Sequence, residues 1–174
     1  MLTKNFFSWT MANLTGKDIV NGYVFPDGTV GNATRQTNKP YYLWEYMNYL
    51  SISDIPSSYL FIGTRIGTGA TPATADDYTM ESVITSGLIT AESNTVTVTK
   101  ENGFVAVYAT YTVTNTGTTA VAISEIGLFG ATNGSSSGTK PILMDRTVLE
   151  SPIVINPGEA KPLTYTIRFN YPVE

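Results

Sequence analysis

GFVAVYATYTVTN, residues 103–115, is the stretch of the sequence that decides the fold class. Every second residue from Val105 to Val113 is apolar, and threonine dominates the positions between them. Because side chains in a strand point alternately to two faces, this pattern predicts one long strand with one buried face. Valine, threonine and tyrosine also favour strands, and no glycine or proline follows Gly103 within the run.

The segments on either side of this strand are also predicted to be strands. Asn102–Gly103 is a two-residue hairpin signal that joins it to the alternating segment Thr95–Lys100. A turn at Asn115–Thr118 leads into Ala120–Gly130, whose apolar phase changes near Ser124–Glu125 and indicates a bulge. We expect these three strands to be consecutive neighbours in one sheet.

The C-terminal third continues the pattern. Ile142–Glu150 and Pro152–Ile155 are predicted to be two separate strands, followed by a type II turn at Asn156–Glu159. Leu163–Tyr171 shows the clearest alternation in the chain, with Leu163, Tyr165, Ile167, Phe169 and Tyr171 predicted to face inward.

Earlier segments are less regular. Ile19–Phe25, Tyr59–Thr64 and Met80–Thr90 are predicted strands, whereas the polar Val30–Lys39 is predicted to be a loop. Leu2–Leu14 has approximate helical spacing and is predicted to be a short helix or an arm.

An aromatic segment, PYYLWEYMNYLSI at Pro40–Ile52, stands out in the first third of the chain. Its apolar spacing predicts a helix near residues 40–50, either covering a sheet or docking on another subunit. Interfaces are enriched in tyrosine and tryptophan. The candidate interface residues are Phe6, Phe7, Trp9, Tyr41, Tyr42, Trp44, Tyr46 and Tyr49.

About eight strands at this turn spacing predict an all-β protein built as an antiparallel β-sandwich, with jelly-roll and immunoglobulin-like topologies both open. Residues 1–58 are predicted to be an N-terminal arm and a docking segment, and residues 59–174 the sandwich. At 174 residues, the two parts are expected to form one compact domain.

Composition argues against several classes of function. The chain has no histidine and no cysteine, so histidine-based catalysis, thiolate metal sites and disulfides are excluded. Its net charge is −4 with scattered basic residues, which argues against nucleic-acid binding. No apolar run is long enough to span a bilayer, and the N-terminus does not resemble a secretory signal. We therefore expect a non-enzymatic protein without a cofactor, made in the cytoplasm and not bound to a membrane.

Charged side chains offer only weak candidates for a site. Asp76, Asp77 and Glu81 are the densest acidic group, which reads either as a Ca²⁺ site or, by default, as a solvated cap. Asp145–Arg146 lies within a predicted strand and is expected to form structural ion pairs.

Several segments together resemble small virion proteins of tailed bacteriophages. They are MLTKNFF at the start, IGTGATPATADDYTMESVITSGL (Ile66–Leu88), VTNTGTTAVAISEIGLFG (Val113–Gly130) and LMDRTVLESPIVINPGEAKPLTYTIRFNYP (Leu143–Pro172). The resemblance covers about two-thirds of the chain, leaves out residues 17–58, and departs from the family pattern at Met80, where leucine is usual.

The resemblance implies a structural role in a phage particle. The first expectation is a capsid decoration protein that forms a homo-oligomer and binds the major capsid protein through apolar and aromatic contacts. The alternative is a neck- or tail-associated module that binds a receptor or a glycan. A hydrolase is a third and weaker hypothesis.

Overall fold

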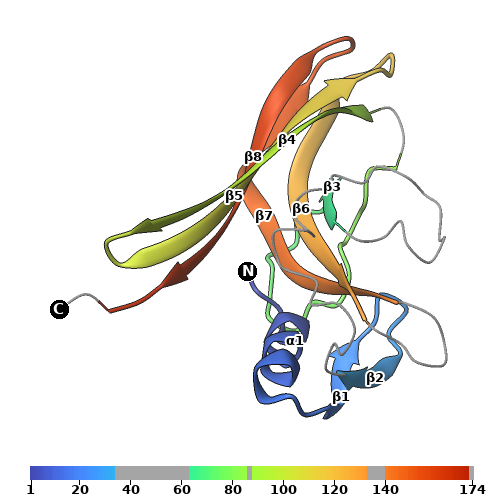
Figure 1. Ribbon diagram of the computed structural model, residues 1–174. Helices are drawn as coiled ribbons and strands as arrows, with labels where there is room; N and C mark the ends of the chain where they lie inside the picture. Colours follow the sequence, from blue (N-terminus) through green and yellow to red (C-terminus); the bar gives the residue numbers. More distant parts are fainter. Residues whose placement is uncertain (34–62, 86–87, 133–139, 173–174) are drawn as a thin grey trace.

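The computed structural model describes residues 1–33, 63–85, 88–132 and 140–172 (Figure 1). Within these ranges the chain is mostly β, with antiparallel sheets and one short helix. The predicted helix near residues 40–50 lies outside the described residues. The elements are α1 (Lys4–Thr15), β1 (Ile19–Val24), β2 (Val30–Ala33), β3 (Gly63–Gly67), β4 (Leu88–Glu101), β5 (Phe104–Asn115), β6 (Val121–Ala131), β7 (Pro141–Ile155) and β8 (Ala160–Asn170).

The long strand predicted at 103–115 is confirmed as β5, the central strand of the sheet β4-β5-β8. Its alternation is also confirmed, because Val107, Ala109, Tyr111 and Val113 are all buried. Gly103 closes the predicted hairpin between β4 and β5 at a φ of 89°, a backbone conformation that glycine adopts without steric cost.

The predicted neighbour on the other side of β5 is wrong. β6 belongs to the second sheet, β3-β6-β7, and β8 takes its place beside β5. Asn115 explains why the chain passes from one sheet to the other after β5. Its side-chain amide donates to the carbonyls of Thr119 and Ile155. Its side-chain oxygen accepts from the Gly117 N–H, and its backbone carbonyl accepts from the Gly158 N–H. These bonds hold the connection as an arch between two sheets instead of a hairpin within one.

The sheet β3-β6-β7 contains the predicted bulge, because the pairing of β6 with β7 shifts between Ile123 and Glu125. The two strands predicted at Ile142–Glu150 and Pro152–Ile155 are in fact one continuous strand, β7. The intervening Ser151 and Pro152 remain in extended backbone, because proline is compatible with a strand whose N–H is not needed for pairing.

The two three-stranded sheets contribute to one hydrophobic core. Ile66, Leu128 and Met144 come from one sheet, and Tyr111 and Ile167 come from the other. Two buried tyrosine hydroxyl groups also join the sheets, with Tyr111 bonded to Thr64 at 2.6 Å and Tyr165 donating to Asp145 at 2.5 Å.

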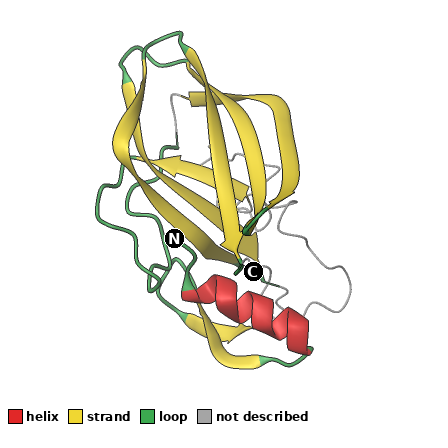
Figure 2. Cartoon of the chain, turned by 90° about the vertical axis from the view of Figure 1, so that its left-hand side faces the viewer, coloured by secondary structure: helices red, strands yellow, loops and turns green. Residues whose placement is uncertain are grey.

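The N-terminal residues pack on the same core. β1 and β2 form a separate two-stranded sheet, so Val30–Ala33 is a strand and not the predicted loop. Tyr23 and Ala33 from this sheet and Phe25 from the turn between its strands join the hydrophobic cluster, as does Phe6 of α1. Figure 2 shows α1 lying across one end of the sheets.

The predicted strand at Met80–Thr90 begins only at Leu88. Residues 82–84 instead run along the outer edge of β3, where Thr68 donates its N–H to Ser82 and Ile84 donates to Ile66. Met80 packs with Phe129 and Leu143 in a smaller apolar cluster.

Candidate interaction surface

α1 has a defined beginning and end. Thr3 caps its first turn by accepting a hydrogen bond from the N–H of Phe6, and Gly16 ends it in the left-handed conformation at a φ of 65°. A threonine N-cap and a glycine directly after the last turn are strong helix boundary signals. Of the two alternatives for Leu2–Leu14, a short helix or an arm, the structure shows the helix, at Lys4–Thr15.

Buried polar contacts fix α1 to the rest of the molecule. The Thr3 hydroxyl donates to the carbonyl of Leu143 at 2.6 Å, and the Thr3 N–H donates to Met144 at 3.0 Å, both on β7. On the other side, the Asn5 side chain donates to the Val24 carbonyl at 2.8 Å and accepts from the Val24 N–H at 2.9 Å. The helix is thus held between β7 and β1.

α1 has apolar side chains on both its inner and its outer face. Asn5, Phe6 and Ala12 are buried, and Phe6 stacks on Phe169 with ring centroids 6.0 Å apart. On the outer face, 53% of Phe7, 49% of Met11 and 76% of Leu14 are exposed. Residues spaced i, i+4 and i+7 share one side of a helix, so these three form an outer apolar stripe.

The structure separates the sequence-predicted interface residues of α1. Phe6 is only 5% exposed and belongs to the core, Trp9 is partly buried against that core, and Phe7 faces solvent. The predicted residues Tyr41, Tyr42, Trp44, Tyr46 and Tyr49 lie outside the described residues. Met11 and Leu14 were missed, although their spacing from Phe7 is a signal that the sequence contains.

The outer apolar stripe is electrically neutral. Lys4 is the only charged residue in α1, and its ammonium group pairs with the Asp76 carboxylate. A partner that covers the stripe therefore gains from apolar contact and needs no charge complementarity along the helix.

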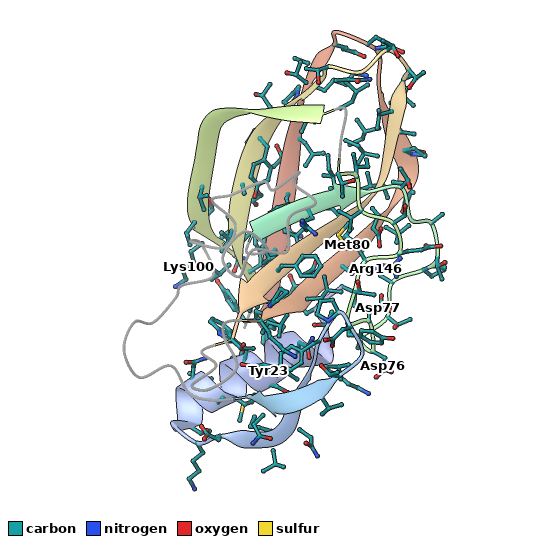
Figure 3. The ribbon with its side chains drawn as sticks, turned by 90° about the vertical axis from the view of Figure 1, so that its right-hand side faces the viewer. Tyr23, Asp76, Asp77, Met80, Lys100 and Arg146 are labelled. Carbon is teal, nitrogen blue, oxygen red and sulfur yellow. The ribbon has the colours of Figure 1, made fainter. Side chains whose placement is uncertain are left out.

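A group of charges, with Arg146 and Glu125 buried at its centre, lies at the side of β7 (Figure 3). The Arg146 guanidinium contacts Glu125 at 2.5 Å, Asp77 at 2.8 Å and Glu81 at 3.5 Å. Glu125 is fully buried and also accepts the backbone N–H groups of Glu81 and Ser82. Arg146 and its three acidic partners thus fasten the segment 68–85 to β6 and β7.

Hydrogen bonds favour the charged forms of Asp77, Glu81 and Arg146. Burial alone would raise the pKa of Asp77, but bonds from Arg146 and Thr74 outweigh it and hold the pKa below its ordinary value. Bonds from the Thr71 and Ala70 N–H groups lower the pKa of Glu81. For Arg146, burial disfavours the charged form, yet the bonds to Asp77 and Glu125 leave its pKa raised.

The same contacts argue against a Ca²⁺ site at Asp76, Asp77 and Glu81. The oxygen atoms of Asp77 and Glu81 already accept protein donors, and Asp76 pairs with Lys4. Among the residues that the structure describes, no acidic cluster is arranged to hold a metal ion. The adjacent Gly69 serves this packing, because a Cβ there would lie 2.5 Å from a Glu125 carboxylate oxygen.

A cavity of about 250 Å³ lies between the β1–β2 turn and the β3-β6-β7 sheet. Its aromatic residues are Phe25 and Phe129, both buried. Lys140 lies 4.7 Å from the centre of the Phe25 ring, and Arg65 lies 5.9 Å from that of Phe129. Each ring is thus buried with a cation over one face, and neither is exposed for stacking on a sugar. The lining residues are Phe25, Pro26, Asp27, Arg65, Thr79, Val83, Phe129, Lys140 and Pro141.

The described part of the chain contains no helix that is both long and apolar enough to cross a membrane. No protein-family model matches the chain, and no curated protein or solved structure shows significant similarity to it.

Proposed function

We propose that this chain is a non-enzymatic structural protein of a tailed-bacteriophage particle, and more specifically a decoration protein on the head shell. It binds the major capsid protein through the outer apolar stripe of α1. We also infer that the two three-stranded sheets form a β-sandwich that supports this helix.

One observation carries the proposal: a firmly anchored helix exposes Phe7, Met11 and Leu14 in a row. Single exposed apolar residues are common, but a row on one helix face is the pattern of a helix that docks in an apolar groove. The contacts of Thr3 and Asn5 fix the orientation of α1 before binding, so little ordering entropy opposes docking. The resemblance of Ile66–Leu88, Val113–Gly130 and Leu143–Pro172 to phage virion proteins adds independent support.

The neutral, apolar character of the stripe is also compatible with binding to a capsid shell. A neutral apolar contact is insensitive to ionic strength, whereas contacts between exposed charges are screened by salt. Many copies bound to a lattice would stabilise the shell by mass action, because each copy binds the assembled state and not the free subunits.

Quantitative mass spectrometry of purified particles tests the placement. A decoration protein is expected in many copies per particle, in a fixed ratio to the major capsid protein. A few copies per particle would instead indicate the neck or tail, and absence from the particle would overturn the proposal.

Binding of purified protein to particles that lack it tests the surface. The triple substitution Phe7→Ser, Met11→Ser and Leu14→Ser is expected to abolish binding while leaving the melting temperature nearly unchanged, because all three side chains are exposed. Val154→Ser is the matched control, since Val154 is an exposed apolar residue on β7. Equal binding by both variants would remove the stripe from the proposal.

The alternative, a glycan- or receptor-binding module of the neck or tail, has less support in the geometry. Sugar sites in proteins commonly use an open aromatic face, whereas the two aromatic rings of the described cavity are buried, with Lys140 over one and Arg65 over the other. A glycan array with the purified chain separates the two functions, and we expect no binding.

A further inference from the structure

We infer that the outer edge of β8 pairs with β8 of a second copy of this chain, in antiparallel orientation about a two-fold axis. This inference does not depend on the proposed function. It begins from the fact that a free strand edge presents a row of backbone N–H and C=O groups ready to pair with another strand.

The phase of the β5–β8 pairing shows which backbone groups are free. Asn115 donates its N–H to Glu159, and Tyr171 donates its N–H to Gly103, while the pairing between these two points continues without a shift. Antiparallel strands alternate between hydrogen-bonded and non-hydrogen-bonded pairs. The odd-numbered residues of β8 therefore direct their backbone N–H and C=O groups toward β5. The even-numbered residues Thr164, Thr166 and Arg168 therefore direct their N–H and C=O groups away from the sheet.

The other edges of the two larger sheets are covered or interrupted. Along β7, Thr3 donates to Met144 and Arg146 donates to Met1, so the first residues of the chain cover that edge at Met144–Arg146. Residues 82–84 cover β3 in the same way. Further along β7, the pairing with β6 shifts between Val148 and Ile153. The pairing of β4 with β5 shifts between Ala91 and Thr95, so this bulge shortens the regular edge of β4 to Thr95–Glu101.

β8 has none of these protections along its centre. Its register with β5 is unbroken from Ala160 to Asn170, and within the described residues no segment pairs with its outer side. Proline appears only near its beginning, at Pro162, an outward-facing position where the missing N–H removes a donor from the free edge. The edge that remains available therefore runs from Thr164 onward.

The free edge at Thr164, Thr166 and Arg168 is compatible with pairing to the same strand of a second copy in one particular register. An antiparallel pair of identical strands has two-fold symmetry, the commonest symmetry of soluble oligomers. With the axis at Thr166, each Thr166 pairs with its equivalent, and each Thr164 pairs with Arg168 of the other copy. This register uses both backbone groups of all three residues, leaves Pro162 outside the central pairs, and keeps the two Arg168 side chains from facing each other. The result is one continuous sheet across both copies.

Cysteine cross-linking tests the register, because the natural chain contains no cysteine. In a directly opposed hydrogen-bonded pair the Cα atoms are about 5.5 Å apart, within the range that a disulfide spans. We expect Thr166→Cys to form a covalent dimer under mild oxidation. Thr97→Cys is the matched control, since Thr97 is an exposed threonine on β4, at the opposite edge of the same sheet.

Sedimentation equilibrium tests the association itself. The unmodified chain is expected to form a dimer as its concentration rises, and Thr166→Lys is expected to weaken the dimer several-fold because it places two like charges opposite each other. Thr97→Lys should leave the dimer unchanged. A chain that stays monomeric at all concentrations, or a Thr97→Cys variant that cross-links as readily as Thr166→Cys, overturns the inference.

Discussion

At the residue scale, the arrangement of Glu125 and Arg146 is the clearest case of a position fixed by its surroundings. The two charges are buried together, and each is needed to compensate the other for the water it has lost. Removing one partner of such a pair leaves the other charge buried and uncompensated. This lowers the free energy of unfolding far more than replacing both charges with apolar side chains does.

Glu125→Gln is therefore expected to destabilise the protein by about 3 kcal/mol, because it leaves the Arg146 charge buried without its nearest carboxylate. Urea unfolding at neutral pH measures this change. Asp76→Asn is the control: Asp76 and its partner Lys4 are both exposed, so the expected loss is below about 1 kcal/mol. Similar losses for both variants would contradict the structural role of the buried pair.

The sequence indicated part of this arrangement. An adjacent acid and base within a strand, Asp145–Arg146, correctly predicts structural ion pairs, but neighbours in a strand point to opposite faces. Arg146 pairs with Glu125 and Asp77, whereas Asp145 accepts from Tyr165. The partners come from segments far apart in the chain, and no local pattern identifies them. The same holds for Asp77 and Glu81, whose spacing is equally compatible with a cation site.

At the element scale, α1 depends on contacts with β1 and β7 for its position. Its boundaries could be predicted from Thr3 and Gly16, but its apolar residues lie on two faces, so periodicity alone does not show which face is buried. Contact with Phe169 and with the β1–β2 sheet decides that Phe6 turns inward and Phe7 outward.

Asn5→Ala is expected to loosen the attachment of α1 to β1. The substitution removes the partner of both the N–H and the C=O of Val24, and we expect a loss of about 2 kcal/mol. Hydrogen exchange at the Val24 amide should accelerate by more than exchange in β5. Asn13→Ala, an exposed position on the same helix, is the comparison. Unchanged protection at Val24 would show that the helix is held by its apolar face alone.

Strand positions followed from alternation wherever one face is buried, as in β5 and in the first part of β8. Phe169 and Tyr171, which were predicted to face inward, are exposed. Alternation did not predict which strands pair with each other. A short turn after Asn115 favours a hairpin between consecutive strands, and only the long-range bonds of the Asn115 side chain to Ile155 and of its backbone to Gly158 make it an arch. Val30–Ala33 was missed as a strand because a four-residue segment beside a turn shows no clear period.

At the scale of the whole molecule, two tyrosine hydroxyl groups join the sheets through the core, and both are expected to govern stability in alkaline solution. Burial raises the pKa of Tyr111 to about 12. Burial and then the charge of Asp145 raise the pKa of Tyr165 well above its ordinary value of 10.0.

A tyrosine with a raised pKa keeps its proton in the folded chain at a pH where the unfolded chain has released it. The contribution of these two tyrosines to the free energy of unfolding is therefore intact below about pH 10 and is lost as the pH rises above that value. Thermal unfolding between about pH 10 and pH 12 should show this decline, and Tyr111→Phe should reduce its steepness. Tyr78→Phe, at an exposed position, should not. An unchanged slope for Tyr111→Phe would show that other groups cause the decline.

The attachment of α1 also has a consequence for the timing of folding. The carbonyl groups of Leu143 and Met144, which accept hydrogen bonds from Thr3, lie about 140 residues further along the chain. Contacts between such distant residues form late, because a large loop must close first. A chain still on the ribosome, or one cut short before β7, has no strand to receive its first residues. The stripe of Phe7, Met11 and Leu14 is consequently presented in its final orientation only by chains whose synthesis has passed β7.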